Sequence, residues 1–272
     1  MCNRKGCDFS INNGDNIYDN GVDSVTDPQF EAKFEKPYAS FTIPFYLVLG
    51  NHDNGDGLGS DSKAGDFQVQ YSTRTDPPRL SDKWNMPARY FPVHKENGNT
   101  TASFFGLDTN TLMFFGDPLS ERDLLGAAQQ AWLDDEIAAS TSTWKFTWAH
   151  HPYISNGQHG NAGESDGIPG QGQNVKTFYE AAACGKVDVI IAGHDHDLQW
   201  IEPVAACGET EFIISGAGGQ VRQLGGGSNP AFFEQGATLG FYWVELVGTK
   251  FTGEIYDVDG NLLFARTFAK HL

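Results

Sequence analysis

The chain has 272 residues, 39% of them apolar, with 20 phenylalanines and 6 tryptophans, so it can build a sizeable, aromatic-rich core. Its formal net charge of −17 argues against nucleic acid or an anionic membrane as its main partner. No apolar run approaches the roughly 18 residues of a membrane span, and no linker divides the chain. We therefore predict a single domain over residues 1–272 that binds neither nucleic acid nor a membrane.

The first half of the chain predicts one helix and several strands. Residues 27–36 favour a helix, because an acidic cap and a first-turn proline precede two phenylalanines that share a face. The apolar run at residues 45–49 predicts a strand. Residues 89–94 and 101–108 alternate around the turn at residues 96–99, which is typical of a hairpin.

The second half alternates helices and strands and then becomes purely β. Helices are expected at residues 126–139, with Trp132, Leu133 and Ile137 facing inward, and at residues 174–183. Strands are expected at residues 146–149, 187–192, 212–215, 238–247, 252–258 and 262–268.

Four short polar segments each follow one of the strand-like runs directly. They are Gly14–Tyr18 (GDNIY), Gly50–Asp53 (GNHD), Ala149–Pro152 (AHHP) and Gly193–His196 (GHDH). Ligands gather at the carboxyl ends of strands in α/β sheets, and the glycines allow tight turns that aim the next side chain inward. Each segment taken alone reads equally well as a plain turn or a structural histidine. Four segments placed alike predict one site that assembles on folding.

The residue types in these segments suit a two-metal centre. Two metals about 3.5–4 Å apart lower the pKa of a shared water and clamp the oxygens of a phosphate ester. Such a centre needs a bridging carboxylate, neutral imidazoles and one or two oxygen donors. The candidates are Asp15 as the bridge, His150, His194 and His196 as nitrogen donors, and Asn51 as an oxygen donor. A tyrosinate at Tyr18 is a hard anionic ligand, better suited to Fe(III) than to Zn(II).

These segments resemble the motifs of the calcineurin-like metallophosphoesterases, and specifically those of the purple acid phosphatases of the small, tartrate-resistant type. The GDxxY, GNH[DE] and GHxH motifs of that family match three of the segments. Its single histidine before an aromatic–Pro step matches His150, although His151 takes the place of the aromatic residue here. The resemblance extends to Phe105–Thr109 (FGLDT) and Ser215–Gly218 (SGAG), and it covers nearly the whole chain.

The resemblance implies an α/β fold, a four-layer sandwich of two mixed β-sheets flanked by helices, with the site at the strand ends. It also implies that Asp15 bridges Fe(III) and a second divalent metal, which could be Fe, Zn or Mn. The other residues that it assigns are Tyr18 and His196 on the iron, Asn51, His150 and His194 on the second metal, and His52 and His159 at the substrate phosphate or leaving group.

The chain departs from this family at its amino end. The family begins with a strand ending in Asp-x-Gly or Asp-x-His, which supplies another iron ligand, and a helix follows. Nothing of that kind precedes Asp15, so we expect a chain that lacks one βα unit of about 30–40 residues. Such a chain would bind iron weakly and hydrolyse esters poorly. Cys2 and Cys7 would belong to the tail of the missing helix, and a Cys184–Cys207 bridge is left open.

The expected function is acid phosphatase activity on small phosphate monoesters, with a water activated at both metals attacking phosphorus in line. One alternative is a phosphodiesterase or nucleotide-cleaving member of the same superfamily, against which Tyr18 argues. Another is a non-catalytic metal- or phosphate-binding relative, which the absent first motif favours. The resemblance implies a protein that is secreted or otherwise lies outside the cytoplasm, or that lies in the vacuole. The first seven residues nevertheless lack the apolar core of a signal peptide. The sequence leaves the physiological substrate and the oligomeric state open.

Overall fold

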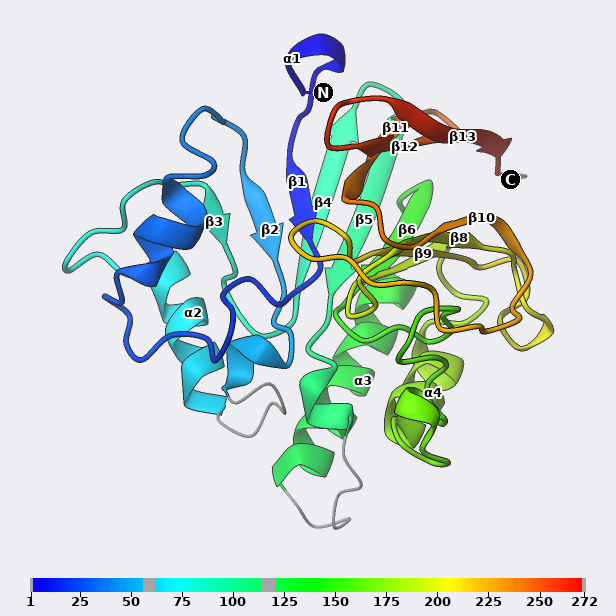
Figure 1. The fold of residues 1–272 in the computed structure, drawn as a ribbon, viewed down its shortest axis with the longest axis horizontal. Coiled ribbons are helices and arrows are strands. Elements are labelled where there is room, and N and C mark those ends of the chain that lie inside the picture. The colour runs from blue at the N-terminus through cyan, green and yellow to red at the C-terminus, as the bar shows by residue number, and fades with distance from the viewer. Residues whose placement is uncertain (1, 56–61, 114–120, 271–272) are drawn as a thin grey trace.

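A seven-stranded mixed sheet forms the centre of the computed structural model, which describes residues 2–55, 62–113 and 121–270 (Figure 1). The strands lie in the order β10-β8-β9-β7-β6-β5-β4. Neighbours among β5, β6, β7 and β9 are parallel, whereas β4, β8 and β10 each pair antiparallel to their neighbours. The bounds are β4 (Phe91–Asn97), β5 (Thr100–Gly106), β6 (Trp144–Trp148), β7 (Val189–Ala192), β8 (Leu198–Ile201), β9 (Glu211–Ser215) and β10 (Ala231–Gln235).

Two three-stranded sheets make the second β layer. One is parallel, in the order β1 (Ser10–Asn12), β2 (Phe45–Leu47), β3 (Trp84–Asn85). The other is antiparallel, in the order β11 (Gly240–Val247), β12 (Lys250–Asp257), β13 (Leu262–Ala269).

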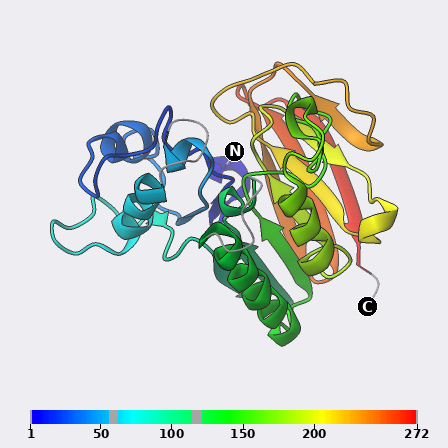
Figure 2. The ribbon, with the colours of Figure 1, turned by 90° about the horizontal axis from the view of Figure 1, so that it is seen from below.

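Helices complete the layers on the outside. α3 (Glu121–Ala139) and α4 (Gln173–Ala182) lie on one side of the large sheet, and Figure 2 shows β11–β13 on the other. α2 (Ser62–Thr73) and the π-helix η1 (Phe30–Glu35) lie with the β1–β3 sheet. The remaining short helices are α1 (Cys2–Lys5), η2 (His52–Asn54), η3 (Asn110–Leu112), η4 (Ser165–Gly167) and η5 (Ala205–Cys207). None of the helices in the described ranges is both long and apolar enough to cross a membrane.

Alternation along the central strands divides the core between the two faces of the large sheet. Phe104 of β5 stacks on Phe146 of β6 at 4.5 Å between ring centroids, within the cluster that also takes in the small sheets. The next residue, Phe105, points to the opposite face and packs in the cluster with Leu133 of α3. A period of two along each strand therefore fixes which side chains face the helices. Leu133 and Ile137 are buried and Trp132 is half-buried, as the sequence predicts.

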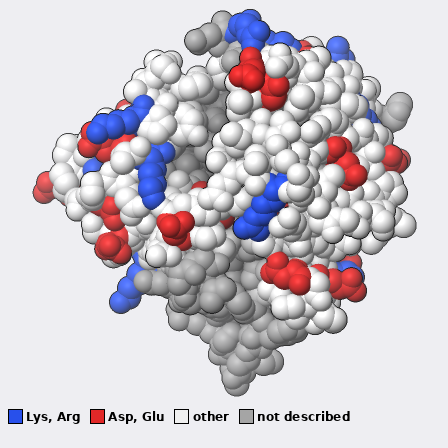
Figure 3. Space-filling model, viewed as in Figure 1, with Lys and Arg blue, Asp and Glu red and all other residues white. Residues whose placement is uncertain are grey.

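The predicted α/β class with a mixed sheet flanked by helices is confirmed, while the second layer differs in detail. It consists of two small sheets instead of one, because β1 and β11 do not pair with each other. A cavity of about 890 Å³ lies between these strands, with Ile11, Phe34 and Trp243 among its lining residues. The face drawn in Figure 3 is hollowed between these two groups of strands, and acidic and basic side chains are interspersed around it.

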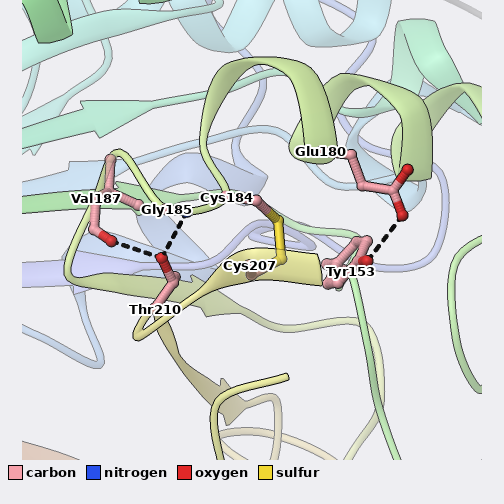
Figure 4. Close-up of a disulfide and its surroundings, with 7 residues drawn as sticks. All are labelled: Tyr153, Glu180, Cys184, Gly185, Val187, Cys207 and Thr210. Atoms are coloured by element: carbon pink, nitrogen blue, oxygen red, sulfur yellow. Dashed lines mark hydrogen bonds between the residues drawn. A yellow bond between two sulfur atoms is a disulfide. The ribbon is translucent and has the colours of Figure 1, made fainter. Parts of the chain in front are cut away.

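All four cysteines form disulfides, which the sequence left unassigned. Cys2 pairs with Cys7, and Cys184 pairs with Cys207. The second bond ties the end of the α4 segment to η5 (Figure 4). Beside it, the Thr210 hydroxyl accepts a hydrogen bond from the backbone N–H of Gly185 and donates one to the carbonyl of residue 187.

Candidate metal centre

The four polar segments meet because the strands before them run parallel. β1 pairs with β2, and β6 pairs with β7, so the carboxyl ends of each pair lie side by side. Asn13 joins the two pairs, since its side-chain amide donates to the backbone carbonyls of Ala192 and Ser215. The candidate site therefore lies where the edge of the small parallel sheet meets the large sheet.

Two glycines permit the close approach of these turns. A Cβ at Gly50 would lie 2.1 Å from Oδ1 of Asp15, and a Cβ at Gly14 would lie 2.7 Å from the backbone nitrogen of Gly50. Gly14 also has a φ of +85°, a left-handed conformation that side chains disfavour. Any other residue at either position would push Asp15 away from the second turn.

One group of donor atoms surrounds Nε2 of His150. This nitrogen lies 2.9 Å from Oδ1 of Asn51, 3.1 Å from Nδ1 of His194 and 3.4 Å from Oδ2 of Asp15. The other ring nitrogen, Nδ1, lies 2.8 Å from the backbone carbonyl of Asn13, so it must donate there. The lone pair of a neutral His150 then points at two oxygen acceptors, an arrangement that requires either an extra proton or a cation.

A second group of donor atoms lies on the other side of Asp15. The Tyr18 hydroxyl donates to Oδ2 of Asp15 at 2.6 Å and lies 3.0 Å from Nε2 of His196. The Nδ1 atom of His196 is buried and has no hydrogen-bond partner among the described residues. Asp15 thus contacts both groups through the same oxygen, as a bridging carboxylate would.

Burial and charge set the protonation states of these groups. Burial lowers the pKa values of His194 and His196, the latter to about 4, and nearby histidines and, at His196, Arg222 lower them further. Both imidazoles are therefore neutral at pH 7, which metal ligation requires. Burial and the negative charge of Asp15 hold the pKa of Tyr18 far above its ordinary value. Tyr18 is thus a phenol in the metal-free protein, and only a cation would make it a tyrosinate.

The donor set fits metal ions. The contacts around His150 span 2.9–3.4 Å, close to the roughly 3.4 Å edge of a tetrahedron with metal–ligand bonds of about 2.1 Å. For His150 itself, burial lowers the pKa, but the charge and hydrogen bond of Asp15, the hydrogen bond to the backbone of Asn13 and the charge of Asp53 together raise the pKa overall. A proton therefore holds the place that a metal would take, and metal binding would release it.

The two predicted outer histidines lie at a cavity of about 240 Å³ beside these donors. The ring nitrogen Nδ1 of His52 donates to the backbone carbonyl of Asp19 at 2.6 Å. His159 stacks on His194 at 4.0 Å between ring centroids, and its Nδ1 contacts the carboxylate of Asp166. All predicted site residues except His150 line this cavity.

Three residues of this site carry no role in the sequence prediction. His151 is buried, and its ligand atoms lie within 4.8 Å of those of His150 and His194. The sequence signal that could have indicated a role for His151 is its place beside His150 at the end of a strand. Arg222 lines the small cavity from the loop after β9; one arginine in a glycine-rich segment is a weak signal. Asp53 lies beneath the first two turns.

Asp53 is fully buried and connects those turns by accepting five hydrogen bonds. Its Oδ2 accepts from the backbone nitrogens of Asn16 and Gly50 and from the amide side chain of Asn16. Its Oδ1 accepts from the backbone nitrogen of Ile17 and from the side chain of Gln68. Burial and the charge of Asp15 raise the pKa of Asp53 to about 6.

Comparison with known proteins agrees with this arrangement. Residues 1–198 match the family model described as calcineurin-like phosphoesterase. Human tartrate-resistant acid phosphatase type 5 is 30% identical over 209 residues, which are 72% of this chain and 58% of that protein. Purple acid phosphatase 7 of Arabidopsis thaliana is 31% identical over 292 aligned residues, covering 97% of this chain and 76% of that protein. The chain thus spans little more than half the length of the tartrate-resistant relatives.

Solved structures show the same fold. A structure titled as GAP50, the anchor in the inner membrane complex of Plasmodium, superposes with a TM-score of 0.77 at 19% identity, covering 100% of this chain and 81% of that one. A structure of PhoD superposes with a TM-score of 0.57 at 15% identity, covering 97% and 67%. Family model, relatives and fold agree, and the chain belongs to the calcineurin-like phosphoesterase family, with purple acid phosphatases among its relatives.

Proposed function

We propose that this chain is a metal-dependent phosphoesterase that hydrolyses phosphate monoesters of small molecules. One observation carries the proposal: acceptor and imidazole atoms from four strand-terminal turns converge on the two sides of Asp15. The family implies a dinuclear metal centre, and two donor groups sharing one carboxylate suit it. When bound, the metals would acidify a water and neutralise the charge of the phosphate.

The donor sets support different metals at the two positions. Tyr18, His196 and Asp15 include two oxygen ligands that carry negative charge when bound, which favours Fe(III). Asn51, His150 and His194 with Asp15 give a set of neutral donors and one carboxylate, which favours a divalent ion such as Zn(II), Mn(II) or Fe(II). The divalent position has four protein ligands and the Fe(III) position has three. We therefore expect the divalent ion to bind with the higher affinity.

The side chains around the small cavity would handle the substrate. His52 donates through Nδ1 to a backbone carbonyl, which fixes its ring and leaves Nε2 as the nitrogen that can meet substrate. His159 is oriented by Asp166 at Nδ1, and its Nε2 faces the guanidinium of Arg222. We therefore assign His52 and His159 to the phosphate and to the leaving-group oxygen.

Turnover of two model esters tests this proposal. The protein is loaded with Fe(III) plus Zn(II), Mn(II) or Fe(II), and hydrolysis of p-nitrophenyl phosphate and bis(p-nitrophenyl) phosphate is measured. We expect the monoester to be preferred and His194→Ala to lower the rate at least about a hundredfold with loss of metal. His94→Ala, an exposed histidine on β4, is the matched control and should change neither.

Three outcomes would overturn the proposal. Preference for the diester would favour the phosphodiesterase alternative. Binding of metal and phosphate without turnover of either ester would favour a non-catalytic binding protein. Monoester hydrolysis that survives a chelator would place the reaction elsewhere on the chain.

The two disulfides support a location outside the reducing cytosol, which we also propose. Disulfides persist in oxidising compartments, and the structure pairs all four cysteines. Thiol titration of the protein isolated without reductant should find no free cysteine. Four free thiols in freshly isolated native protein would contradict this location.

A further inference from the structure

Arg222 lies at the small cavity with its backbone held on both sides. Its N–H donates to the carbonyl of His196 at 2.8 Å, and its own carbonyl accepts from the N–H of Ala237 at 2.7 Å. The first bond ties it to the GHDH turn, and the second ties it to the segment between β10 and β11. The side chain is half-buried and lines the cavity together with Asp15, His52 and His159.

The guanidinium of Arg222 makes no ion pair within the described ranges of the chain. Its one side-chain hydrogen bond runs from Nη1 to Nε2 of His159, at 2.9 Å. By contrast, the half-buried Arg89 and Arg266 each pair with a carboxylate, at 2.8 and 2.7 Å. A guanidinium has five N–H donors and stays charged, so four donors of Arg222 remain for another acceptor.

The tautomer of His159 follows from this contact. Arginine can only donate, so Nε2 of His159 must be the acceptor, and the ring proton of the neutral imidazole lies on Nδ1. Nδ1 in turn faces the carboxylate of Asp166, which accepts. A neutral ring nitrogen is a weak partner for a guanidinium compared with an anionic oxygen, so an anion entering the cavity would displace it.

Arg222 is the only lysine or arginine among the described residues that line the small cavity. Its charge lies in a cavity that the carboxylates of Asp15 and Asp166 also line. Because a guanidinium stays charged, Arg222 offers an entering phosphate a charge-assisted contact at this place.

We infer that Arg222 binds the terminal oxygens of the substrate phosphate and makes this site prefer monoesters over diesters. The inference rests on the proposed function and names one of its specificity residues. A planar guanidinium binds two phosphate oxygens side by side. A monoester dianion offers three terminal oxygens, so it can meet Arg222 and the metals together. A diester offers two terminal oxygens and one negative charge, so it loses one of these partners.

The experiment compares Arg222→Gln and Arg222→Lys with the wild type. The glutamine side chain can still donate to His159 but has no charge. The lysine side chain keeps the charge but lacks the planar guanidinium that binds two oxygens side by side. Arg4→Gln, an exposed arginine near the amino end, is the matched control. Each metal-loaded protein is titrated with inorganic phosphate by calorimetry, and KM and kcat are measured for the two p-nitrophenyl esters.

We expect Arg222→Gln to weaken phosphate binding and to raise the monoester KM by about 10- to 100-fold, as loss of a charge-assisted contact does. The diester KM should change less than about threefold, Arg222→Lys should fall between, and metal content should not change. Equal losses for both esters, or unchanged phosphate affinity in Arg222→Gln, would overturn the inference. The phosphate titration needs no turnover, so a wild type that binds phosphate without hydrolysis would count against the proposed function. In that case the phosphate affinity of Arg222→Gln would still test the contact between Arg222 and phosphate.

Discussion

Replacing Asp53 by alanine should both destabilise the fold and release metal. Its carboxylate accepts five hydrogen bonds, three of them from backbone N–H groups of the two turns that carry Asp15 and Asn51. Asp53→Ala leaves those donors without this acceptor; Ile17 and Gly50 are buried, and Asn16 is half-buried. A buried N–H without an acceptor costs about 1–3 kcal/mol.

The two buried groups give a loss of at least about 2 kcal/mol in the free energy of unfolding, and up to about 6 kcal/mol if the turns do not relax. Even the lower figure is a large part of the roughly 5–15 kcal/mol by which a domain is stable. Because the turns position Asp15 and Asn51, we also expect metal affinity to fall. Asp53→Asn keeps the shape and one acceptor, so its loss should be intermediate.

Urea unfolding of the metal-free proteins gives the stability change, and metal analysis after loading gives the second effect. Asp23→Ala, which removes an exposed carboxylate elsewhere in the chain, is the control and should stay within about 0.5 kcal/mol of the wild type. A loss below about 1 kcal/mol in Asp53→Ala, with full metal content, would refute the view that this carboxylate builds the site.

Three further outcomes are expected. Tyr18→Phe should abolish the visible absorption band of the Fe(III)-loaded protein, and a wild type that holds stoichiometric iron without colour would contradict the tyrosinate. His52→Ala and His159→Ala should each lower kcat with metal content unchanged, whereas metal loss in both would show that these histidines are ligands. Replacing Cys184 and Cys207 together by alanine should lower the free energy of unfolding by about 3 kcal/mol; an unchanged urea midpoint would show that the disulfide does not stabilise the fold.

Much of the fold could be predicted because periodicity reports burial. The apolar runs before three of the polar segments are strands β2, β6 and β7, and the first segment follows the short strand β1. The hairpin of β4 and β5 follows its turn signal. The short strands β3, β8 and β10 were missed. Each has five residues or fewer, which is too short for a clear period, and their pairing depends on neighbours far away in the sequence.

The helix expected at residues 27–36 forms only in part. Asp27 precedes it, and its Oδ1 accepts from the backbone nitrogen of Gln29 at 2.8 Å. The N-cap position itself is Gln29, which makes no side-chain capping bond, so Asp27 is not the cap that the sequence predicts. The regular part is a π-helix over Phe30–Glu35. The helix α2 was not expected, because its sequence (SKAGDFQVQYST) has a glycine and a weak apolar stripe.

The candidate site divides in the same way. Motif spacing predicted the site residues whose type and position are both distinctive, such as Asp15 and His194. It did not bring forward His151, Asp53 or Arg222, since a second histidine, a buried carboxylate and a loop arginine take their meaning from what they contact. Those contacts join residues up to 63 positions apart, as between Arg222 and His159, and arise only when the strands pair.

The central claim is that the four turns form one two-metal centre around Asp15, and anomalous diffraction from crystals loaded with Fe(III) and Zn(II) tests it most directly. Data at the two absorption edges should show two peaks in contact with Asp15, the iron peak beside Tyr18 and His196 and the zinc peak beside His150 and His194. A single peak held by His150, His151 and His194, or metal bound only at surface carboxylates, would contradict the account.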